Sequence, residues 1–379
     1  MREWGLETEM REYQVWMPHT TEARLWRVAP DTLELVLAEG PVPGDSVTME
    51  SGQIVMANGY SGAGDVSGEV VYVNYGLIED YARLESLGVS VRGKVAIARY
   101  GRSFRGIKAR EAERNGAAAL VLYSDPAEDG FTRGDVYPDG PMRPATGVQR
   151  GSVMNGTGDP TTPGWASVRG ARRLPLDSAR VPRIPVIPIS WSNAAELLRD
   201  VRGTAIPQEW QGGLPFRYHI GPGPVRARVV VRLDTATNAI KSIWNTYGTI
   251  RGATYPDQLI VLGAHRDSWG PGAVDDVSGT VSILEAARAV AEEVRAGRRP
   301  KRTIVFATWD AEEWGLIGST EYVEQDSARL TSGGVAYLNQ DVAVGGPSFG
   351  SGGSPSLRAG LRDVVKGIDD RSRGGTNYA

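Results

Sequence analysis

The sequence predicts an α/β protein whose main domain has a mostly parallel, doubly wound sheet and carries a second α/β domain as an insertion. After residue 238, apolar segments of strand length alternate with helical segments, which is typical of a parallel sheet covered by helices on both faces. Residues 69–125 show a smaller strand, helix and strand unit, followed by a stretch rich in glycine and proline. We therefore expect a main domain formed by residues 1–54 and 239–379, and an inserted α/β domain formed by residues 55–238.

The composition is that of an ordinary globular protein, with 41% hydrophobic and 23% charged residues among 379. The 42 basic and 45 acidic residues give a net charge of -3, which argues against nucleic acid as a partner. Cysteine is absent, so a metal site would depend on His, Asp and Glu. No apolar run approaches the roughly 18–20 residues of a membrane span.

The elements of the first half follow from local pattern. Residues 1–13 are predicted to form a short polar helix, and residues 13–17 and 23–29 alternate well enough for edge strands. Ser192 is the predicted N-cap of a helix in the inserted domain. That domain is predicted to have strands at 69–76, 93–101 and 117–125 and helices at 105–116 and 192–201.

The second half alternates more regularly. The amphipathic segment 278–297 is predicted to be a long helix, with an apolar face of helical period. The remaining predictions are strands at 240–252, 257–265, 301–309 and 334–341, and a helix at 315–330.

Candidate metal ligands follow three of these strands. His265, the pair Glu312 and Glu313, and Asp341 each stand at a strand end, and Asp275 precedes a helix. Carboxyl ends of parallel strands meet at one edge of a sheet, where such folds place their sites. Imidazole and carboxylates together are ligands for zinc and similar ions, and one shared acid can hold two ions about 3.5–4 Å apart.

A metal site would explain why Glu312 and Glu313 stand side by side at a strand end. One can bind a metal while the other faces a metal-held water as general base, because neighbouring side chains point in different directions. Asp267, two residues after His265, can reach back to the imidazole and fix its tautomer.

The stretches LIVLGAHRDSWGPGAVDDVSG, RTIVFATWDAEEWGLIGSTEYVEQ and GVAYLNQD resemble glutamate carboxypeptidase II-like co-catalytic dizinc peptidases, the family of prostate-specific membrane antigen (folate hydrolase) and of bacterial aminopeptidases. VYVNYG, GKVAIARYGRSFRGIK, LVLYSDPAEDG and GDPTTPGW resemble the protease-associated domain of that family. The likeness extends from about residue 55 to 345. It implies a dizinc peptidase core and a protease-associated insertion.

The resemblance implies a role for each candidate ligand. His265, Asp275 and Asp341 would hold one zinc, and Asp275 would bridge to a second zinc held by Glu313. Glu312 would be the general acid/base that activates a metal-bridged water for hydrolysis of small peptides.

Further positions match the family outside the zinc site. Glu321 and Glu324 match the carboxylates of a structural calcium site, which the loop around Thr162 and Trp165 would complete. Two residues match substrate-binding positions: Arg105 corresponds to an arginine that grips the terminal carboxylate, and Ser152 replaces an asparagine that assists it.

The chain departs from the family after Asp341. A further histidine ligand of the second zinc, a helical dimerisation domain and several pocket residues would lie beyond residue 379, so we expect a C-terminally truncated chain that is inactive as it stands. The longer form is expected to be a homodimer through that helical domain. An extracytoplasmic location is expected, with a leader outside this sequence.

Two alternatives remain open at this point. One is an aminopeptidase of the same family, since the serine at 152 puts glutamate specificity in doubt. The other is a non-catalytic binding protein like the transferrin receptor, which has the same scaffold without the catalytic metal ligands.

Overall fold

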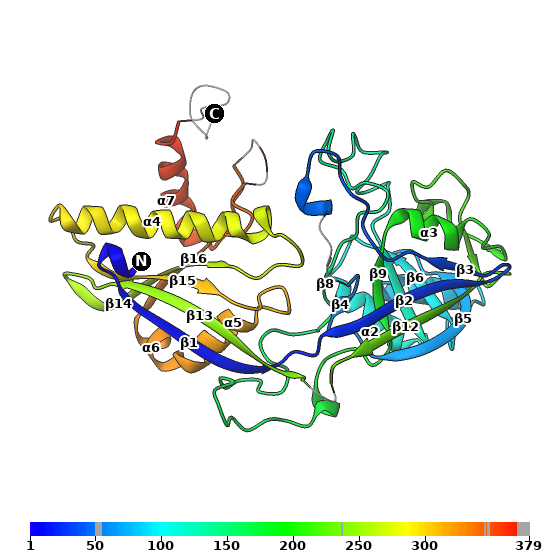
Figure 1. The fold of residues 1–379 in the computed structure, drawn as a ribbon, viewed down its shortest axis with the longest axis horizontal. Coiled ribbons are helices and arrows are strands. Elements are labelled where there is room, and N and C mark those ends of the chain that lie inside the picture. The colour runs from blue at the N-terminus through cyan, green and yellow to red at the C-terminus, as the bar shows by residue number, and fades with distance from the viewer. Residues whose placement is uncertain (50–54, 236–237, 345, 347–348, 370–379) are drawn as a thin grey trace.

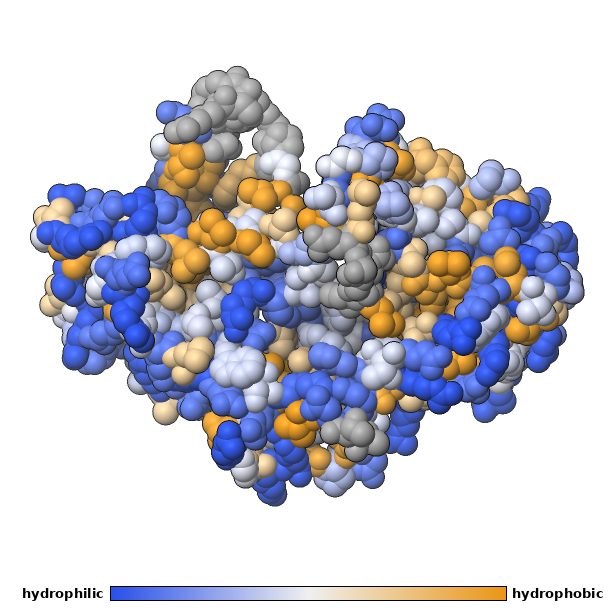
Figure 2. All heavy atoms as spheres, in the orientation of Figure 1, coloured by the Kyte–Doolittle hydropathy of each residue, from blue (hydrophilic) through white to orange (hydrophobic). Residues whose placement is uncertain are grey.

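A computed structural model describes residues 1–49, 55–235, 238–344, 346 and 349–369. The chain forms two lobes, each built on its own sheet, and extended segments connect them (Figure 1). Surface residues at the outer ends of both lobes are mostly hydrophilic, with hydrophobic residues scattered between them (Figure 2). No helix in the described ranges is long and apolar enough to cross a lipid bilayer.

The first lobe contains a five-stranded sheet in the order β1-β13-β15-β14-β16. Strands β14, β15 and β16 run parallel, β13 pairs antiparallel with β15, and β1 pairs antiparallel with β13. The strands are β1 (Glu7–Trp16), β13 (Ile240–Ile250), β14 (Tyr255–His265), β15 (Arg302–Trp309) and β16 (Gly334–Asn339).

Helices cover both faces of this sheet. The long helix α4 (Ser278–Arg295) lies on one face, and α5 (Ile317–Gln325) and α6 (Ser327–Gly333) lie on the other (Figure 1). Successive side chains of β15 point to opposite faces of the sheet, so a hydrophobic core forms on each face. Phe306 packs with α4, whereas Val305 packs on the side of α5. The predicted doubly wound α/β arrangement is confirmed.

The second lobe contains a seven-stranded sheet and the largest hydrophobic core. Its order is β3-β2-β12-β5-β6-β7-β9, with β5, β6, β7 and β9 parallel. The strands are β2 (Thr20–Ala29), β3 (Leu33–Leu35), β5 (Gly64–Tyr72), β6 (Val95–Arg99), β7 (Ala119–Tyr123), β9 (Val186–Ile189) and β12 (Arg226–Leu233); the helices are α1 (Ile78–Ser86), α2 (Arg105–Arg114) and α3 (Trp191–Leu198).

Short elements complete the described chain. The strand pairs β4 (Asn58–Gly59) with β8 (Gly151–Ser152), and β10 (Thr204–Ala205) with β11 (His219–Gly221), form two small sheets. Helical turns are η1 (Arg2–Trp4), η2 (Ser46–Met49), η3 (Leu176–Ser178), η4 (Gln208–Trp210) and η5 (Ala273–Val277), and α7 (Pro355–Lys366) is the last helix.

Two predictions for the N-terminal segment are wrong. Residues 1–13 do not form the predicted helix: only Arg2–Trp4 make a helical turn, and Glu7–Trp16 pair with β13 along their whole length. Pairing partners more than 200 residues away decide this conformation, and they override a weak local preference. The second error concerns the division at residue 54: β2 and β3 belong to the sheet of the inserted domain, not to that of the main domain.

Two helix details also differ from the prediction. The hydroxyl of Ser190, not of Ser192, caps α3 by accepting the N–H of Asn193 at 3.2 Å. The segment predicted as one helix over 315–330 is divided at Asp326 into α5 and α6.

Candidate metal centre

The three parallel strands of the first lobe end close together in register. His265, the last residue of β14, pairs with Trp309, the last residue of β15, and Gly263 pairs with Asn339 at the end of β16. Side chains that follow these strands therefore emerge at one edge of the sheet. The predicted convergence of strand ends is observed.

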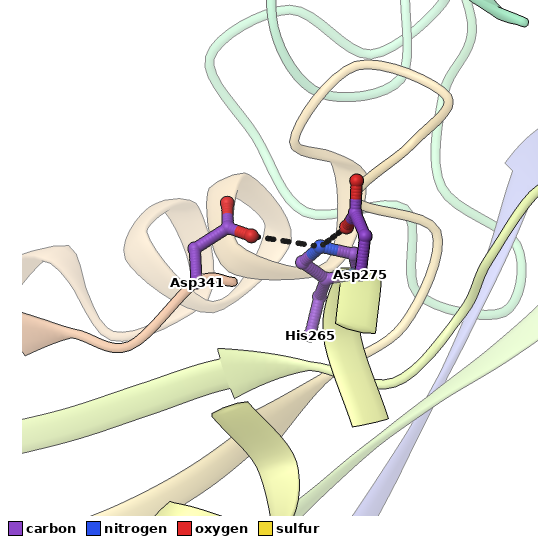
Figure 3. Close-up of side chains that lie close together, drawn as sticks. All are labelled: His265, Asp275 and Asp341. Atoms are coloured by element: carbon purple, nitrogen blue, oxygen red, sulfur yellow. Dashed lines mark ion pairs between the residues drawn. The ribbon is translucent and has the colours of Figure 1, made fainter. Parts of the chain in front are cut away.

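An imidazole and two carboxylates form the centre of this edge (Figure 3). The Nε2 atom of His265 lies 3.1 Å from Asp275 Oδ1 and 3.5 Å from Asp341 Oδ1. One ligand atom of each of these residues lies within 4.8 Å of those of the other two. The imidazole is buried, at 3% exposure, whereas the carboxylates of Asp275 and Asp341 are 55% and 41% exposed, so solutes can reach the cluster.

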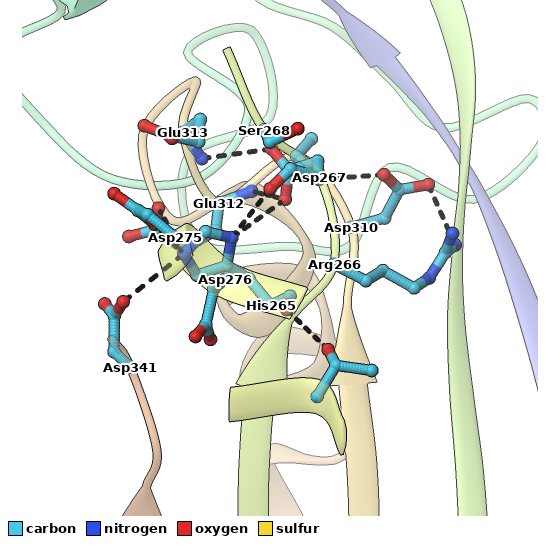
Figure 4. Close-up of polar contacts among 12 residues, drawn as sticks. His265, Arg266, Asp267, Ser268, Asp275, Asp276, Asp310, Glu312, Glu313 and Asp341 are labelled. Atoms are coloured by element: carbon cyan, nitrogen blue, oxygen red, sulfur yellow. Dashed lines mark hydrogen bonds and ion pairs between the residues drawn. The ribbon is translucent and has the colours of Figure 1, made fainter. Parts of the chain in front are cut away.

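The two glutamates lie beside this trio, in the turn between β15 and α5 (Figure 4). Glu312 Oε2 is 3.8 Å from His265 Nε2. Burial, with the charge of Asp275 and then that of Glu312, raises the pKa of Glu313 to about 8. The charge of Asp275 therefore acts on Glu313, although Glu313 does not belong to the group of His265, Asp275 and Asp341.

Asp267 connects the imidazole to the glutamates, as Figure 4 shows. Its backbone carbonyl lies 3.0 Å from His265 Nδ1, and its carboxylate Oδ1 lies 3.5 Å from the same atom. The carboxylate also accepts the backbone N–H groups of Glu312 and Glu313, at 3.0 and 3.2 Å. This second contact could not be read from sequence spacing, because it joins residues 45 positions apart.

Asp276 is a site residue that the sequence reasoning missed. It is fully buried, and its Oδ1 accepts the N–H of Gly279 in α4 and of Val342 next to Asp341, both at 3.0 Å. It therefore holds the loop of Asp341 against the helix start. An acid three residues before a helical N–H is an N-cap signal, which could have identified it.

Among the described residues, several acids crowd around the single imidazole of His265. Burial raises the pKa of Glu312 to about 7, and the charges of Asp267 and Asp341 contribute in the same direction. Burial alone would lower the pKa of His265, but the hydrogen bond with Asp267 and the charge of Glu312 raise it to about 10. A proton on His265 is thus favoured where a cation would otherwise stand, and the donor set of imidazole and carboxylates suits a divalent ion.

The predicted calcium residues also meet in space. Glu321 Oε2 accepts the N–H of Ser167 at 2.5 Å, and Glu324 Oε1 accepts that of Gly164 at 2.6 Å. Burial raises the pKa of Glu321 to about 7. Helix α5 therefore presents both carboxylates to the loop that contains Thr162.

The predicted loop partners make local contacts. The hydroxyl of Thr162 lies 2.6 Å from that of Ser167, and the Trp165 indole donates to the carbonyl of Arg172 at 2.8 Å. Close by, the Arg173 guanidinium contacts the Asp159 carboxylate at 2.6 Å. Hydrogen bonds therefore hold this loop in place, and Arg173 neutralises part of its negative charge.

The two predicted substrate residues lie in the same region of the second lobe. Arg105 is the first residue of α2, and its guanidinium lies against Gly151 of β8, next to Ser152. Ser152 is buried, and its hydroxyl accepts the N–H of Met154 at 3.1 Å. A local backbone contact thus already uses one acceptor site of Ser152.

A cavity lies where the metal-site loop meets the second lobe. It has a volume of about 780 Å³. Trp269, Gly270 and Pro271 line it from the loop before Asp275, and Arg143 and Arg150 line it from the second lobe. Both lobes therefore shape the approach to this edge of the sheet.

Comparisons with known proteins place two domains on the chain. The model of peptidase family M28 matches residues 245–370, and that of the PA domain matches residues 50–155. The first range contains all five predicted zinc-site residues, and the second contains Arg105 and Ser152.

Several relatives are carboxypeptidases by name. "Probable glutamate carboxypeptidase AMP1" of Arabidopsis thaliana is 38% identical over 97% of this chain and 50% of its own length. "Probable glutamate carboxypeptidase LAMP1" of the same plant is 44% identical over 83% of this chain and 45% of its own length. "Aminopeptidase NAALADL1" of Mus musculus is 37% identical over 82% and 43%. The chain spans about half the length of these relatives.

Solved structures support the fold. A peptidase M28 precursor from Shewanella amazonensis superposes with a TM-score of 0.54 at 17% identity, covering 96% of this chain and 68% of the other. The zinc aminopeptidase BSAP from Bacillus subtilis gives 0.51 at 18% identity, covering 90% and 60%.

Proposed function

The chain is a glutamate carboxypeptidase-like member of peptidase family M28 that carries a PA domain, and on this premise we propose that it is a zinc-dependent exopeptidase acting on small peptides. The observation that carries the proposal is the meeting of His265, Asp275 and Asp341 at one sheet edge, with Glu312 beside them. Four separate strand ends or loops supply these groups.

The chain's own residues would hold two ions. His265, Asp275 and Asp341 would bind the first, and Asp275 together with Glu313 would bind the second. Divalent ions there would polarise a peptide carbonyl and make water a stronger nucleophile at neutral pH. The crowded carboxylates with raised pKa values support this assignment, because cations would relieve their repulsion.

Glu312 would move the proton. Its carboxylate could accept a proton from the attacking water and then give it to the leaving amine, and burial, which raises its pKa, supports this role. Asp267 fixes the backbone of Glu312, so the carboxylate starts from a defined position.

Arg105 would decide which end of the peptide is bound. A guanidinium can form two parallel hydrogen bonds to a carboxylate, which suits the terminal group of a carboxypeptidase substrate. Ser152 follows Gly151, which the Arg105 guanidinium contacts, and would assist as a polar residue nearby. The second candidate is an aminopeptidase, favoured by the name of the mouse relative.

The test is hydrolysis of two matched dipeptides by the zinc-loaded protein, produced with any coding sequence beyond residue 379. We expect cleavage of the peptide with a blocked amino end and a free carboxylate. Cleavage only of the peptide with a free amino end and a blocked carboxylate would favour the aminopeptidase. A protein that purifies without stoichiometric zinc and cleaves neither peptide would contradict both enzymes and favour a binding protein.

We also propose a structural Ca²⁺ at Glu321 and Glu324, completed by the loop of Thr162 and Trp165. Support comes from the buried Oε2 of Glu324, which has no hydrogen-bond partner among the described residues. Calcium takes six to eight oxygen ligands, and loop carbonyls can supply several of them. Added Ca²⁺ should raise the thermal unfolding temperature of the wild type but not of Glu324→Gln. An equal rise in both would contradict the site.

A further inference from the structure

The Arg105 guanidinium lies between aromatic rings and forms no ion pair with an acid of the described residues. Its Cζ is 5.8 Å from the centre of the Tyr100 ring and 5.6 Å from that of Phe104. Its Nε is buried and lacks a hydrogen-bond partner among the described residues. A buried N–H group without a hydrogen-bond partner is unfavourable, which indicates a side chain positioned for a ligand.

Gly151 provides the space for this guanidinium. A methyl group added at Gly151 would overlap the Nη1 and Cζ atoms of Arg105. The residue has a φ of +145, a region that side chains rarely adopt. Its carbonyl accepts the Asn58 amide at 2.9 Å, so the backbone cannot easily move away.

Lys108 holds the beginning of α2 from the opposite side. It is fully buried one helical turn after Arg105, and its Nζ donates to the carbonyls of Tyr75 and Gly101, both at 2.7 Å. Tyr75 follows β5, and Gly101 follows β6, in the loop that leads into α2. One ammonium group therefore joins two strand ends to the helix that carries Arg105.

Gly106 lets the same helix approach β8 closely. A methyl group added there would lie 2.8 Å from the carbonyl oxygen of Val153. The Gly106 carbonyl accepts the Asn155 amide at 2.9 Å. The first turn of α2 is thus held to the 151–155 segment and, through Lys108, to the strand ends.

We propose that Gly151 and Lys108 are positioning residues for Arg105. Gly151 leaves the volume in which the guanidinium lies, and Lys108 holds the start of α2. This inference rests on the proposed function, in which Arg105 binds the terminal carboxylate of the peptide. Two parallel hydrogen bonds to a carboxylate require a defined plane and distance, so a small shift of Arg105 weakens them.

The experiment measures carboxylate preference by calorimetric titration. The full chain, supplied with zinc and carrying Glu312→Gln to prevent hydrolysis, is titrated with an amino-blocked dipeptide and with its carboxyl-terminal amide. The ratio of the two dissociation constants is the preference. We expect Gly151→Ala and Lys108→Met each to reduce it about tenfold while the affinity for the amide stays constant.

Matched controls separate positioning from general damage. Gly156 has a φ of +159, and nothing lies within 4 Å of an added methyl, so Gly156→Ala carries similar backbone strain without overlap. Lys94→Met removes a lysine that pairs only loosely with Glu69, at 3.7 Å. Both controls should keep the wild-type preference, and thermal unfolding of every variant reports its folding.

The outcomes distinguish this inference from the proposed function. An unchanged preference in folded Lys108→Met and Gly151→Ala, with a lost preference in Arg105→Gln, would overturn the positioning roles alone. If Gly151→Ala does not fold, Lys108→Met decides the question by itself. An unchanged preference in Arg105→Gln would overturn the carboxylate role of Arg105, and this inference with it.

Discussion

The carboxylate of Asp267 accepts the backbone N–H of Glu312 at 3.0 Å, and its other oxygen accepts that of Glu313 at 3.2 Å. A single acid next to the imidazole of β14 thus fixes the turn that presents both glutamates. A backbone fixed in this way has less freedom to lose when a metal or substrate binds.

Asp267→Asn should therefore damage both folding and the metal site. An amide has one acceptor oxygen, so one backbone N–H loses its partner and faces an NH₂ group instead. We expect a loss of about 1–3 kcal/mol in the free energy of unfolding and about 10- to 100-fold weaker zinc binding. Denaturant unfolding and zinc titration measure these effects. Unchanged values in both would show that the contacts of Asp267 are unimportant.

Glu312→Gln, made in the protein with any coding sequence beyond residue 379, should remove turnover while zinc remains bound. The amide cannot accept the proton of the attacking water, so we expect kcat to fall by about 10²–10⁴-fold. The exposed Glu209, changed to Gln, is the matched control and should leave kcat unaltered. Elemental analysis checks the zinc content. Turnover equal to that of the wild type would exclude Glu312 as the base.

His265→Gln should reduce zinc affinity strongly, because the imidazole is the only nitrogen ligand in the described trio. We expect zinc affinity to fall by more than the 10- to 100-fold that is typical when a residue hydrogen-bonded to a metal ligand is replaced. His219→Gln, in β11 of the second lobe, is the control and should bind zinc like the wild type. Equal affinities for the two variants, measured by competition with a chelating dye, would argue against this metal centre.

Lys108 should give the protein a specific dependence of stability on pH. Burial lowers its pKa from 10.5 to about 8, so above pH 8 the folded state binds fewer protons than the unfolded state. Stability should then rise between about pH 8 and 10.5, by up to about 3 kcal/mol. Lys108→Met should lack this rise. Denaturant unfolding across that range, compared between the two proteins, tests it, and parallel curves would contradict a depressed pKa.

Ser190→Ala should cost about 0.5–2 kcal/mol in the free energy of unfolding, because the N–H of Asn193 loses its cap. Ser192→Ala should cost less, since its hydroxyl contacts only that of Ser190 among the described residues. Thermal unfolding of the two variants measures the difference. A larger loss of stability for Ser192→Ala would support Ser192 as the N-cap, as predicted from sequence.

Local sequence pattern was sufficient for the elements with strong periodicity. The predicted helix at 278–297 and the predicted strand at 301–309 both correspond closely to α4 and β15. The segment 1–13 is short and polar, so its conformation depends on β13, a partner that no local window contains. For the same reason, sequence could not show that β2 joins the second sheet.

By itself, the sequence determined which residue types end the parallel strands, and hence that an imidazole and acids would meet at one sheet edge. Strand ends are a local property, and parallel pairing places them together. Only the tertiary structure decided the contacts between distant segments: Asp267 with the glutamate backbone, Asp276 with the loop of Asp341, and Gly151 with the Arg105 guanidinium. Such contacts depend on the distance and direction of groups far apart in the chain, which folding alone brings together.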